Sequence, residues 1–438
     1  MARSNGIAIR QELRKLFPST KLMQLARFTG AVIRQRKVKI EAFFWTLVLG
    51  FGVGRKRTIA GLRRVYEKTT GTSIEESSFY DRFTPALVRM LKYATAHAFE
   101  HSIGVGRRLR GHLQTFLDVI LTDSTVVRLH DLLAKAFPAC RTNHTQAALK
   151  AHAILSVTGG GKQSVKVTSQ RQHDGPVFRV GRWVADRLLI FDLGYFRYQL
   201  FSCITRNGGY FLSRLKGNTN PTIVALNRSH RGRSIALEGQ KLRDVIGRLK
   251  RGVLDVDVVV RFPRRRYGGR RHYTTQTLRV VAVLDERTKR YHVYVTNVPP
   301  EKLAAEDIQA TYALRWEIEL VFAELKDNYR LKDMPSRKRV VVEALLYVTL
   351  LTLVVSRRLL MVIRNRLAKQ ADRTRHRRWA AVFESTALDL VAIVCRPYKE
   401  VRSLERRVGL TLLREAVDPN RSRPSLLQAV EAGVHEYR

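Results

Sequence analysis

A helix with two unlike faces, between Tyr312 and Lys326, places the strongest constraint on how this chain folds. The segment reads Y-A-L-R-W-E-I-E-L-V-F-A-E-L-K and follows Pro299-Pro300, as a helix that starts after a break would. At about 100° per residue, Tyr312, Arg315, Glu319 and Lys326 fall within an arc of roughly 60°. One face therefore carries a phenol, two cations and a carboxylate, which is either a functional site or a solvated stripe of charge.

The neighbouring arc of this helix is apolar and needs a core to pack against. Its members are Leu314, Ile318, Val321, Phe322 and Leu325. Glu317 and Glu324 point to a third side, which we expect to face water.

The charge of the chain indicates its partner. The 438 residues include 80 Lys and Arg against 37 Asp and Glu, a formal net charge of +43. Like charges in such excess repel one another in a compact protein unless a polyanion neutralises them. The composition therefore predicts a nucleic-acid partner.

Cysteine usage and hydropathy indicate the compartment. Cys140, Cys203 and Cys395 are far apart and lack the spacing of metal ligands, which favours buried free thiols in a reducing compartment. The apolar run Val340 to Val355 is interrupted by Glu343 and is better explained as a buried helix than as a membrane span. We therefore expect a cytoplasmic protein without a membrane partner.

Helical apolar spacing dominates residues 1–110. Within this region, a short basic helix breaks at Thr70-Gly71-Thr72, and Ser73 is expected to cap a second helix with polar tips. This pattern fits a DNA-reading helix-turn-helix and an ordinary helical hairpin equally well.

Strand patterns begin at Phe116. The segment Phe116–Thr122 is a strand candidate that ends at Asp123-Ser124-Thr125, with Val126–Leu129 continuing beyond. The nearly apolar strand Arg187–Phe191 ends at Asp192. Further strands are expected at Ala147–Val157, Gln163–Thr168 and Tyr210–Arg214, with a helix over Tyr195–Thr205.

A change in composition marks residues 217–300, where strands rich in Val, Thr and Tyr follow one helix. The first two long strands are joined by an arginine-dense tip suited to phosphate backbones. Its arginines are Arg264, Arg265, Arg266, Arg270 and Arg271. After the helix that contains Tyr312 to Lys326, long helices are expected at Val340–Ile363, Trp379–Cys395 and Val401–Ala416.

Three carboxylates suit metal-dependent phosphoryl chemistry. Asp123 and Asp192 at the ends of adjacent strands would lie close together, and the packed helix would add Glu319. Two Mg²⁺ ions need such oxygen ligands. Arg315 and Lys326 would then hold phosphates, and Tyr312 would donate to a phosphate oxygen.

Two other chemistries have weaker support. Ser124 and Thr125 are nucleophiles in principle, but we expect no His–Asp pair beside them, so they are interpreted as structural. His152, in a predicted strand, is interpreted as a core or edge residue instead of a metal ligand.

Together, Asp123-Ser124-Thr125, Asp192-Leu193-Gly194-Tyr195 and Tyr312-x2-Arg315-x3-Glu319-x6-Lys326 resemble the DDE transposases of bacterial insertion sequences. The resemblance is to the group with the Y-R-E-K signature, the insertion sequence four family, and covers roughly residues 115–365.

The resemblance implies an α/β fold with a ribonuclease H-like catalytic core, interrupted by a mostly β insertion and flanked by helical regions. The implied divisions are a DNA-binding region at 1–110, catalytic segments at 111–216 and 301–365, the insertion at 217–300 and a C-terminal region at 366–438.

It also implies a chemistry and partners. Asp123, Asp192 and Glu319 would hold two Mg²⁺ or Mn²⁺ ions, while Tyr312, Arg315 and Lys326 would contact DNA. The reaction would be cut-and-paste movement of an element with terminal inverted repeats, in a bacterial, nucleoid-associated protein. Both ends must be cut and joined to one target, so we expect a dimer on DNA. A decayed, non-catalytic DNA-binding protein and a plain metal-dependent nuclease remain the alternatives.

Overall fold

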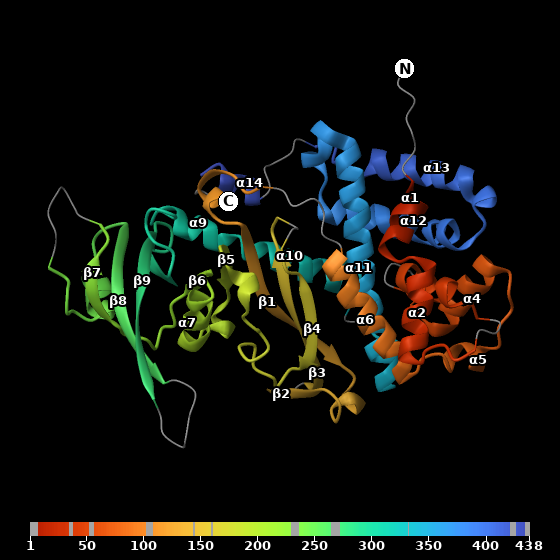
Figure 1. The fold of residues 1–438 in the computed structure, drawn as a ribbon, viewed down its shortest axis with the longest axis horizontal. Helices are drawn as coiled ribbons and strands as arrows, with labels where there is room; N and C mark the ends of the chain where they lie inside the picture. Colours follow the sequence, from red (N-terminus) through yellow and green to blue (C-terminus); the bar gives the residue numbers. More distant parts are fainter. Residues whose placement is uncertain are drawn as a thin grey trace.

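The computed structural model describes most of the chain, arranged as one large sheet with helices gathered mainly at one end (Figure 1). The described residues are 8–34, 38–51, 57–101, 108–142, 145–158, 161–228, 236–263, 272–331, 333–420 and 426–433. The arginine-dense tip at 264–271 lies outside them.

A single ten-stranded sheet forms the centre of the molecule, with strand order β2-β3-β1-β5-β6-β10-β9-β8-β7 and β4 paired to β3. The strands are β1 (Asp118–Leu129), β2 (Pro138–Thr142), β3 (Thr145–Ser156), β4 (Ser164–Ser169), β5 (Arg187–Phe191), β6 (Tyr210–Arg214), β7 (Thr222–Leu226), β8 (Val253–Pro263), β9 (Tyr273–Asp285) and β10 (Arg290–Thr296).

The direction of the strands changes along the sheet. β1, β5 and β6 run parallel, whereas β3 pairs antiparallel with β1 and β4 pairs antiparallel with β3. β10 pairs antiparallel with β6, so the predicted β segment between 217 and 300 extends this same sheet. β5 carries apolar side chains on both faces, and Leu188 through Phe191 are all fully buried, as its sequence predicts.

Helices cover the sheet, and one hydrophobic core continues from a face of the sheet into the helical end. They are α1 (Ile9–Leu16), α2 (Ser19–Thr29), α3 (Ile40–Trp45), η1 (Thr46–Phe51), α4 (Ile59–Thr70), α5 (Glu76–Tyr80), α6 (Pro85–His101), α7 (Tyr198–Arg206), α8 (Leu242–Arg248), α9 (Asp307–Ala313), α10 (Trp316–Ala323), η6 (Glu324–Asn328), α11 (Arg339–Leu367), α12 (His376–Cys395), α13 (Tyr398–Glu415) and α14 (Leu426–Glu431). Shorter turns of helix are η2 (Gly111–Thr115), η3 (Asp131–Leu133), η4 (Arg182–Val184), η5 (Leu193–Tyr195) and η7 (Ala368–Arg373).

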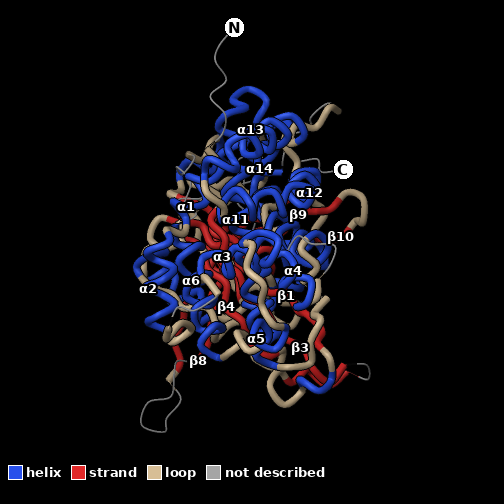
Figure 2. The backbone as a smooth tube through the Cα atoms, turned by 90° about the vertical axis from the view of Figure 1, so that its right-hand side faces the viewer, coloured by secondary structure: helices blue, strands red, loops and turns tan. Residues whose placement is uncertain are grey.

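The long helix α11 forms the axis of the helical end. It contacts α6 and η1 from the N-terminal region and α12 and α13 from the C-terminal region. Seen from that end, these helices lie in front of the sheet (Figure 2). By length and composition α11 is apolar enough to cross a membrane, yet 78% of its most apolar window is buried within the protein. This agrees with the prediction of a buried helix.

Some local predictions were wrong. β1 is not interrupted at Asp123-Ser124-Thr125, because its antiparallel pairing with β3 runs unbroken through these residues to Leu129, the expected end of the continuation. β2 and β7 were missed: both are only five residues long, and β2 begins with a proline. Cys140 is exposed instead of buried, although all three cysteines are free.

The predicted helical break in the N-terminal region is present, but its second helix is short. α4 ends before Gly71, whose φ of 70° closes the helix, as glycine does readily. α5 has only five residues, and its N-cap is Glu75 instead of Ser73. The structure therefore leaves the helix-turn-helix and hairpin interpretations both open.

A buried ion pair connects the far half of the sheet to the segment that leads into α9. Arg279 donates to both oxygens of Asp255, at 2.9 and 2.6 Å. The same guanidinium donates to the carbonyls of Val298, at 3.1 Å, and Leu303, at 2.7 Å. Both charged side chains are almost completely buried, at 3% and 4% exposed, so each depends on the other for its solvation.

We predict that Arg279→Met lowers the free energy of unfolding by about 3–5 kcal/mol, because Asp255 is left buried without a counter-ion. Urea unfolding measures the loss. The control Lys289→Met breaks the exposed pair with Glu286, where both side chains are more than 70% exposed, and should change little. Equal losses in the two variants would contradict the structural role of the buried pair.

Candidate active site

Two aspartates meet where the parallel pairing of the central strands stops. β1 and β5 pair from Asp118↔Arg187 to Thr122↔Phe191. Asp123 is the next residue of β1 and Asp192 is the first residue after β5, so the two carboxylates are neighbours, as predicted. Asp192 leaves the strand and accepts a hydrogen bond from Gly194 N, at 3.4 Å.

The helix predicted to supply the third carboxylate packs on this part of the sheet, with α10 in contact with β1. Most of its apolar face is buried as expected: Leu314 and Ile318 are fully buried, and Phe322 and Leu325 nearly so. Val321, the fifth residue of the predicted face, is only partly buried. The helix is not continuous, however. A tight turn at Leu314 and Arg315 separates α9 from α10, and a π-helical turn follows at η6.

Arg315 connects the carboxylates of the helix and the sheet. Its Nη1 donates to Glu319 Oε1, one helical turn along, and lies 3.6 Å from Asp123 Oδ2. Its side chain is only 16% exposed, so the attraction is poorly screened by water. Three predicted site residues from distant parts of the sequence are thus brought together.

Tyr312 presents a neutral hydroxyl close to this cluster. Its ring packs against Tyr294, with centroids 5.2 Å apart, and lies 5.8 Å from the Arg315 guanidinium. Burial raises the pKa of Tyr312 to about 12, so the group stays protonated at neutral pH. Within the described part of the chain, its buried hydroxyl has no hydrogen-bond partner. A ligand oxygen would satisfy that donor.

The π-helical turn η6 carries two side chains for which the sequence made predictions. Glu324 was expected to face water, but it is 4% exposed and pairs with Arg357 of α11. α11 and α12 pack against η6 and cover this side of the helix, which the helical spacing alone does not predict. Lys326 lies on this turn, partly exposed, and forms no ion pair with another described residue.

The pKa of Asp123 is raised to about 6, chiefly because the carboxyl is buried. The Ser124 backbone N–H and Arg315 favour its ionised form, whereas the charges of Asp192 and Glu319 oppose it. The three carboxylates therefore repel one another electrostatically, and a cation placed among them would relieve that repulsion.

A fourth carboxylate, Asp174, was missed by the sequence analysis. It accepts a hydrogen bond from Ser124 Oγ at 2.9 Å and lies 3.2 Å from His152 Nδ1 and 3.3 Å from Lys150 Nζ. Burial opposes its ionisation, but His152, Ser124 and Lys150 outweigh burial and lower the pKa of Asp174 to about 2. A sequence analysis that had paired β1 with β3 in the observed register would have placed Ser124 opposite His152, which are two of the three partners of Asp174.

The expectation that no His–Asp pair accompanies Ser124 is therefore wrong. The serine nevertheless donates to the carboxylate, so His152 is not placed to take its proton. His152 is buried, at 5% exposed, in agreement with its interpretation as a core residue. Asp174 instead holds the strand immediately after Asp123 in place.

Tyr195 is a second residue that was missed as a site component. It follows Asp192 by three residues and is 1% exposed, and its hydroxyl has no hydrogen-bond partner among the described residues. Burial raises the pKa of Tyr195 far above its usual value, and Asp174, Asp123 and Asp192 raise it further. The hydroxyl is thus a permanent donor beside the aspartates.

The donor set suits a hard divalent cation, since carboxylate oxygens are its preferred ligands. Among the described residues, however, no three His, Cys, Asp or Glu side chains converge into a ready-made metal site. Arg315 takes the central position between Asp123 and Glu319. The residues that would hold a metal are therefore Asp123, Asp192 and Glu319, once that guanidinium has moved.

Comparisons with known proteins agree with this chemistry. A family model described as the transposase DDE domain matches residues 114–355. The transposase for insertion sequence element IS231B from Bacillus thuringiensis subsp. berliner is 23% identical over 399 residues, covering 82% of this chain and 81% of the relative. The transposase for IS1151 from Clostridium perfringens is 20% identical over 325 residues, covering 68% and 69%.

We predict opposite effects on stability for the two buried aspartates. The folded pKa of Asp123 is above its unfolded value, so its contribution to stability is present below about pH 4 and lost as pH rises through about 6. In EDTA, Asp123→Asn should therefore be more stable than wild type at pH 7, with the difference disappearing near pH 4.

The matched variant Asp174→Asn should be less stable than wild type at pH 7. Its folded pKa is depressed, so its stabilisation is present above the unfolded value and lost as pH falls toward about 2. Urea unfolding at several pH values measures both variants. Destabilisation by Asp123→Asn at pH 7 would contradict the assigned electrostatics.

Proposed function

Because the chain belongs to the transposase DDE domain family and is a DNA-cleaving transposase of an insertion sequence, we propose that it works by cut-and-paste transposition. In this proposal it cleaves the ends of its element and joins the freed 3′ ends to target DNA. The observation that carries the proposal is the convergence of Asp123, Glu319 and Arg315.

The proposed catalytic ligands are Asp123, Asp192 and Glu319. Two Mg²⁺ or Mn²⁺ ions held there would activate the attacking oxygen and stabilise the leaving 3′ oxygen. Asp174, through Ser124, orients the strand that carries Asp123 and so limits the movement of the first ligand.

Arg315 has two positions in the proposed reaction. Without DNA it neutralises Glu319 and Asp123. When a phosphate arrives, the planar guanidinium turns to it and donates in a bidentate manner, which frees the carboxylates. Tyr312 donates its unpartnered hydroxyl to a phosphate oxygen, and Lys326 adds a positive charge farther along the helix.

The proposed catalytic core is ribonuclease H-like. Supporting this, the neighbouring strands β4-β3-β1-β5-β6 comprise three antiparallel strands followed by two that run parallel to β1.

In the proposed division of the chain into domains, the catalytic core consists of residues 111–216 and 301–365. Residues 217–300 form the insertion, residues 1–110 bind DNA, and residues 366–438 form the C-terminal region.

The proposed partners are the terminal inverted repeats and the target DNA, in the bacterial cytoplasm where the nucleoid lies. Arg264, Arg265, Arg266, Arg270 and Arg271 in the tip of the insertion would hold the phosphate backbone. Because two ends must be joined to one target, we propose a dimer that assembles on DNA, which neutralises the mutual repulsion of two +43 chains.

We predict that Glu319→Gln abolishes cleavage of element ends in Mg²⁺ while DNA binding stays intact or becomes tighter. The variant loses a metal ligand, but it also loses a negative charge that faces phosphate. Cleavage of a labelled end duplex and a binding titration in EDTA measure the two properties separately.

Glu317→Gln is the matched control, because it makes the same chemical change two residues away and should be nearly neutral for cleavage. Residual cleavage by Glu319→Gln above a few per cent of wild type would remove Glu319 from the active site. Strand transfer from a pre-cleaved end distinguishes the transposase from a plain nuclease, which would cut but not join.

A further inference from the structure

The last long helix, α13, has one face committed to the core of the protein. Val401, Glu405, Val408 and Leu412 are buried at helical spacing. α13 packs on α12 and also contacts α11 and α1, so it is firmly attached to the helical end of the molecule. Glu405 therefore lies on the buried face, where it accepts a hydrogen bond from the backbone N–H of Arg10, at 2.8 Å.

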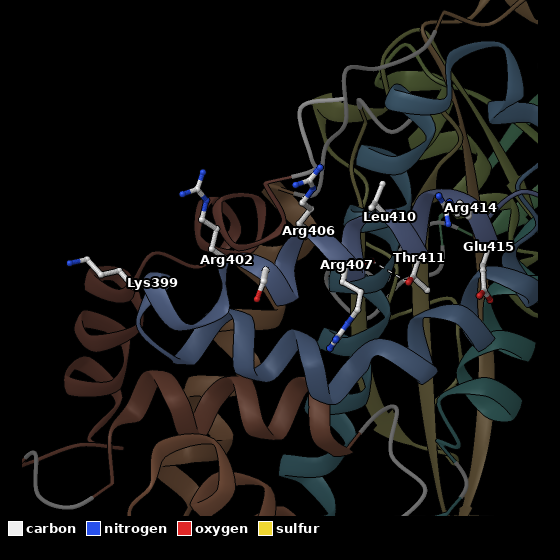
Figure 3. Close-up of a pocket in the computed structure, with 9 residues that line it drawn as sticks. Lys399, Arg402, Arg406, Arg407, Leu410, Thr411, Arg414 and Glu415 are labelled. Carbon is white, nitrogen blue, oxygen red and sulfur yellow. Dashed lines mark hydrogen bonds between the residues drawn. The ribbon is translucent and has the colours of Figure 1, made fainter. Parts of the chain in front are cut away.

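The opposite face of α13 is a row of exposed cations around a shallow groove. The cations are Lys399, Arg402, Arg406, Arg407 and Arg414. At about 100° and 1.5 Å per residue they cover an arc of roughly 140° and extend over about 22 Å. Lys399, Arg402 and Arg406 follow one another along the helix (Figure 3). The one acidic residue of the groove is Glu415, at the far end.

These five side chains are here called the α13 basic row. Two common reasons for cations on the surface of a helix are ion pairs with acidic neighbours and compensation of the helix dipole, and neither accounts for this row. None forms an ion pair with a described acidic residue, whereas Arg14 pairs with Glu41 and Arg358 with Glu12 elsewhere on the helical end. Compensation of the helix dipole does not explain them either. Cations stabilise only the last turn of a helix, and most of the row lies before it.

We propose that the α13 basic row binds the phosphate backbone of duplex DNA, at a site separate from the carboxylates on the sheet. The choice of DNA rests on the proposed function of the chain. A row of exposed cations about 22 Å long can contact several phosphates and releases their counter-ions on binding. Arginine suits this role because it donates to phosphate in a bidentate manner.

A second copy of the chain fits this surface poorly. A two-fold interface brings the same patch of both protomers together, so five cations would face five cations. The position of α13 adds a functional reason for DNA. α13 packs against α1 through its buried face, so the row belongs to the same helical end of the molecule as the proposed DNA-binding residues 1–110.

The test uses the full-length triple variant Arg402→Gln, Arg406→Gln, Arg407→Gln with a duplex of about 30 base pairs in EDTA. Each phosphate that the variant no longer neutralises should reduce the slope of log K against log salt by about 0.9, so three phosphates give about 2.7. Between 50 and 200 mM salt, the affinity of wild type should then fall by about 40-fold more than that of the variant.

Arg287→Gln, Lys289→Gln, Arg290→Gln is the control for net charge, because it removes the same three charges from the exposed β9–β10 turn. Its slope should stay close to that of wild type. Replacing the same three α13 arginines with lysine keeps the charge and should restore most of the slope. Unfolding in urea shows whether each variant is folded.

An unchanged slope in a folded triple variant would overturn the proposal. An equal reduction of the slope in the control variant would also overturn it. So would a triple variant that binds DNA as wild type does but binds polyglutamate, a probe for an acidic protein partner, more weakly. Each of these outcomes leaves metal-dependent cleavage and its dependence on Glu319 untouched. Conversely, a DNA-binding row in a protein without metal-dependent cleavage would overturn the proposed function alone.

Discussion

The mutual repulsion of carboxylates in a partly buried site is the constraint on which this structure depends. Asp123 and Asp192 meet because the parallel register of β1 and β5 ends one residue before both of them. Glu319 is added by a helix whose apolar face packs on the sheet, and burial then strengthens the repulsion that water would weaken elsewhere. Arg315 balances these charges from within the chain. A cation supplied by an arginine side chain can leave when a phosphate competes for it, whereas the carboxylates are fixed by strand and helix.

Much of this arrangement could be predicted from local pattern. The predicted bounds of the strands Arg187–Phe191 and Tyr210–Arg214 agree with the structure at both ends. Short apolar runs bounded by polar residues are typical of buried strands and can form few other elements. The approach of Asp123 to Asp192 followed from strand adjacency. Asp174 could not be found in this way, because its partners Ser124 and His152 become neighbours only through the pairing of β1 with β3. Glu324 was misplaced because its side of the helix is covered by α11 and α12, which follow later in the sequence and contact η6 only in the folded protein.

The charge of the chain is organised differently at its two kinds of polar site. At the carboxylate cluster, opposite charges are interleaved and largely shielded from water, so interactions are strong and geometrically specific. On α13, cations without acidic partners among the described residues face water. Such a surface attracts a polyanion over a distance set by ionic strength and carries little sequence information. The first arrangement is suited to chemistry on one phosphate and the second to holding many.

Two ion pairs, one buried and one partly buried, explain how one carboxylate on a helix is placed accurately against a sheet. Before α9, Arg279 joins Asp255 of the sheet to the carbonyls of Val298 and Leu303. After α10, Glu324 pairs with Arg357 of α11, the central helix of the helical end. The helical segment is therefore anchored at both ends, on the sheet and on α11, with Glu319 between the anchors. Because a buried ion pair gains little net stability over apolar packing, its use at both ends is better explained by positional accuracy than by stability. Accuracy is what phosphoryl transfer requires, since metal ligands and attacking oxygen must be aligned within a fraction of an ångström.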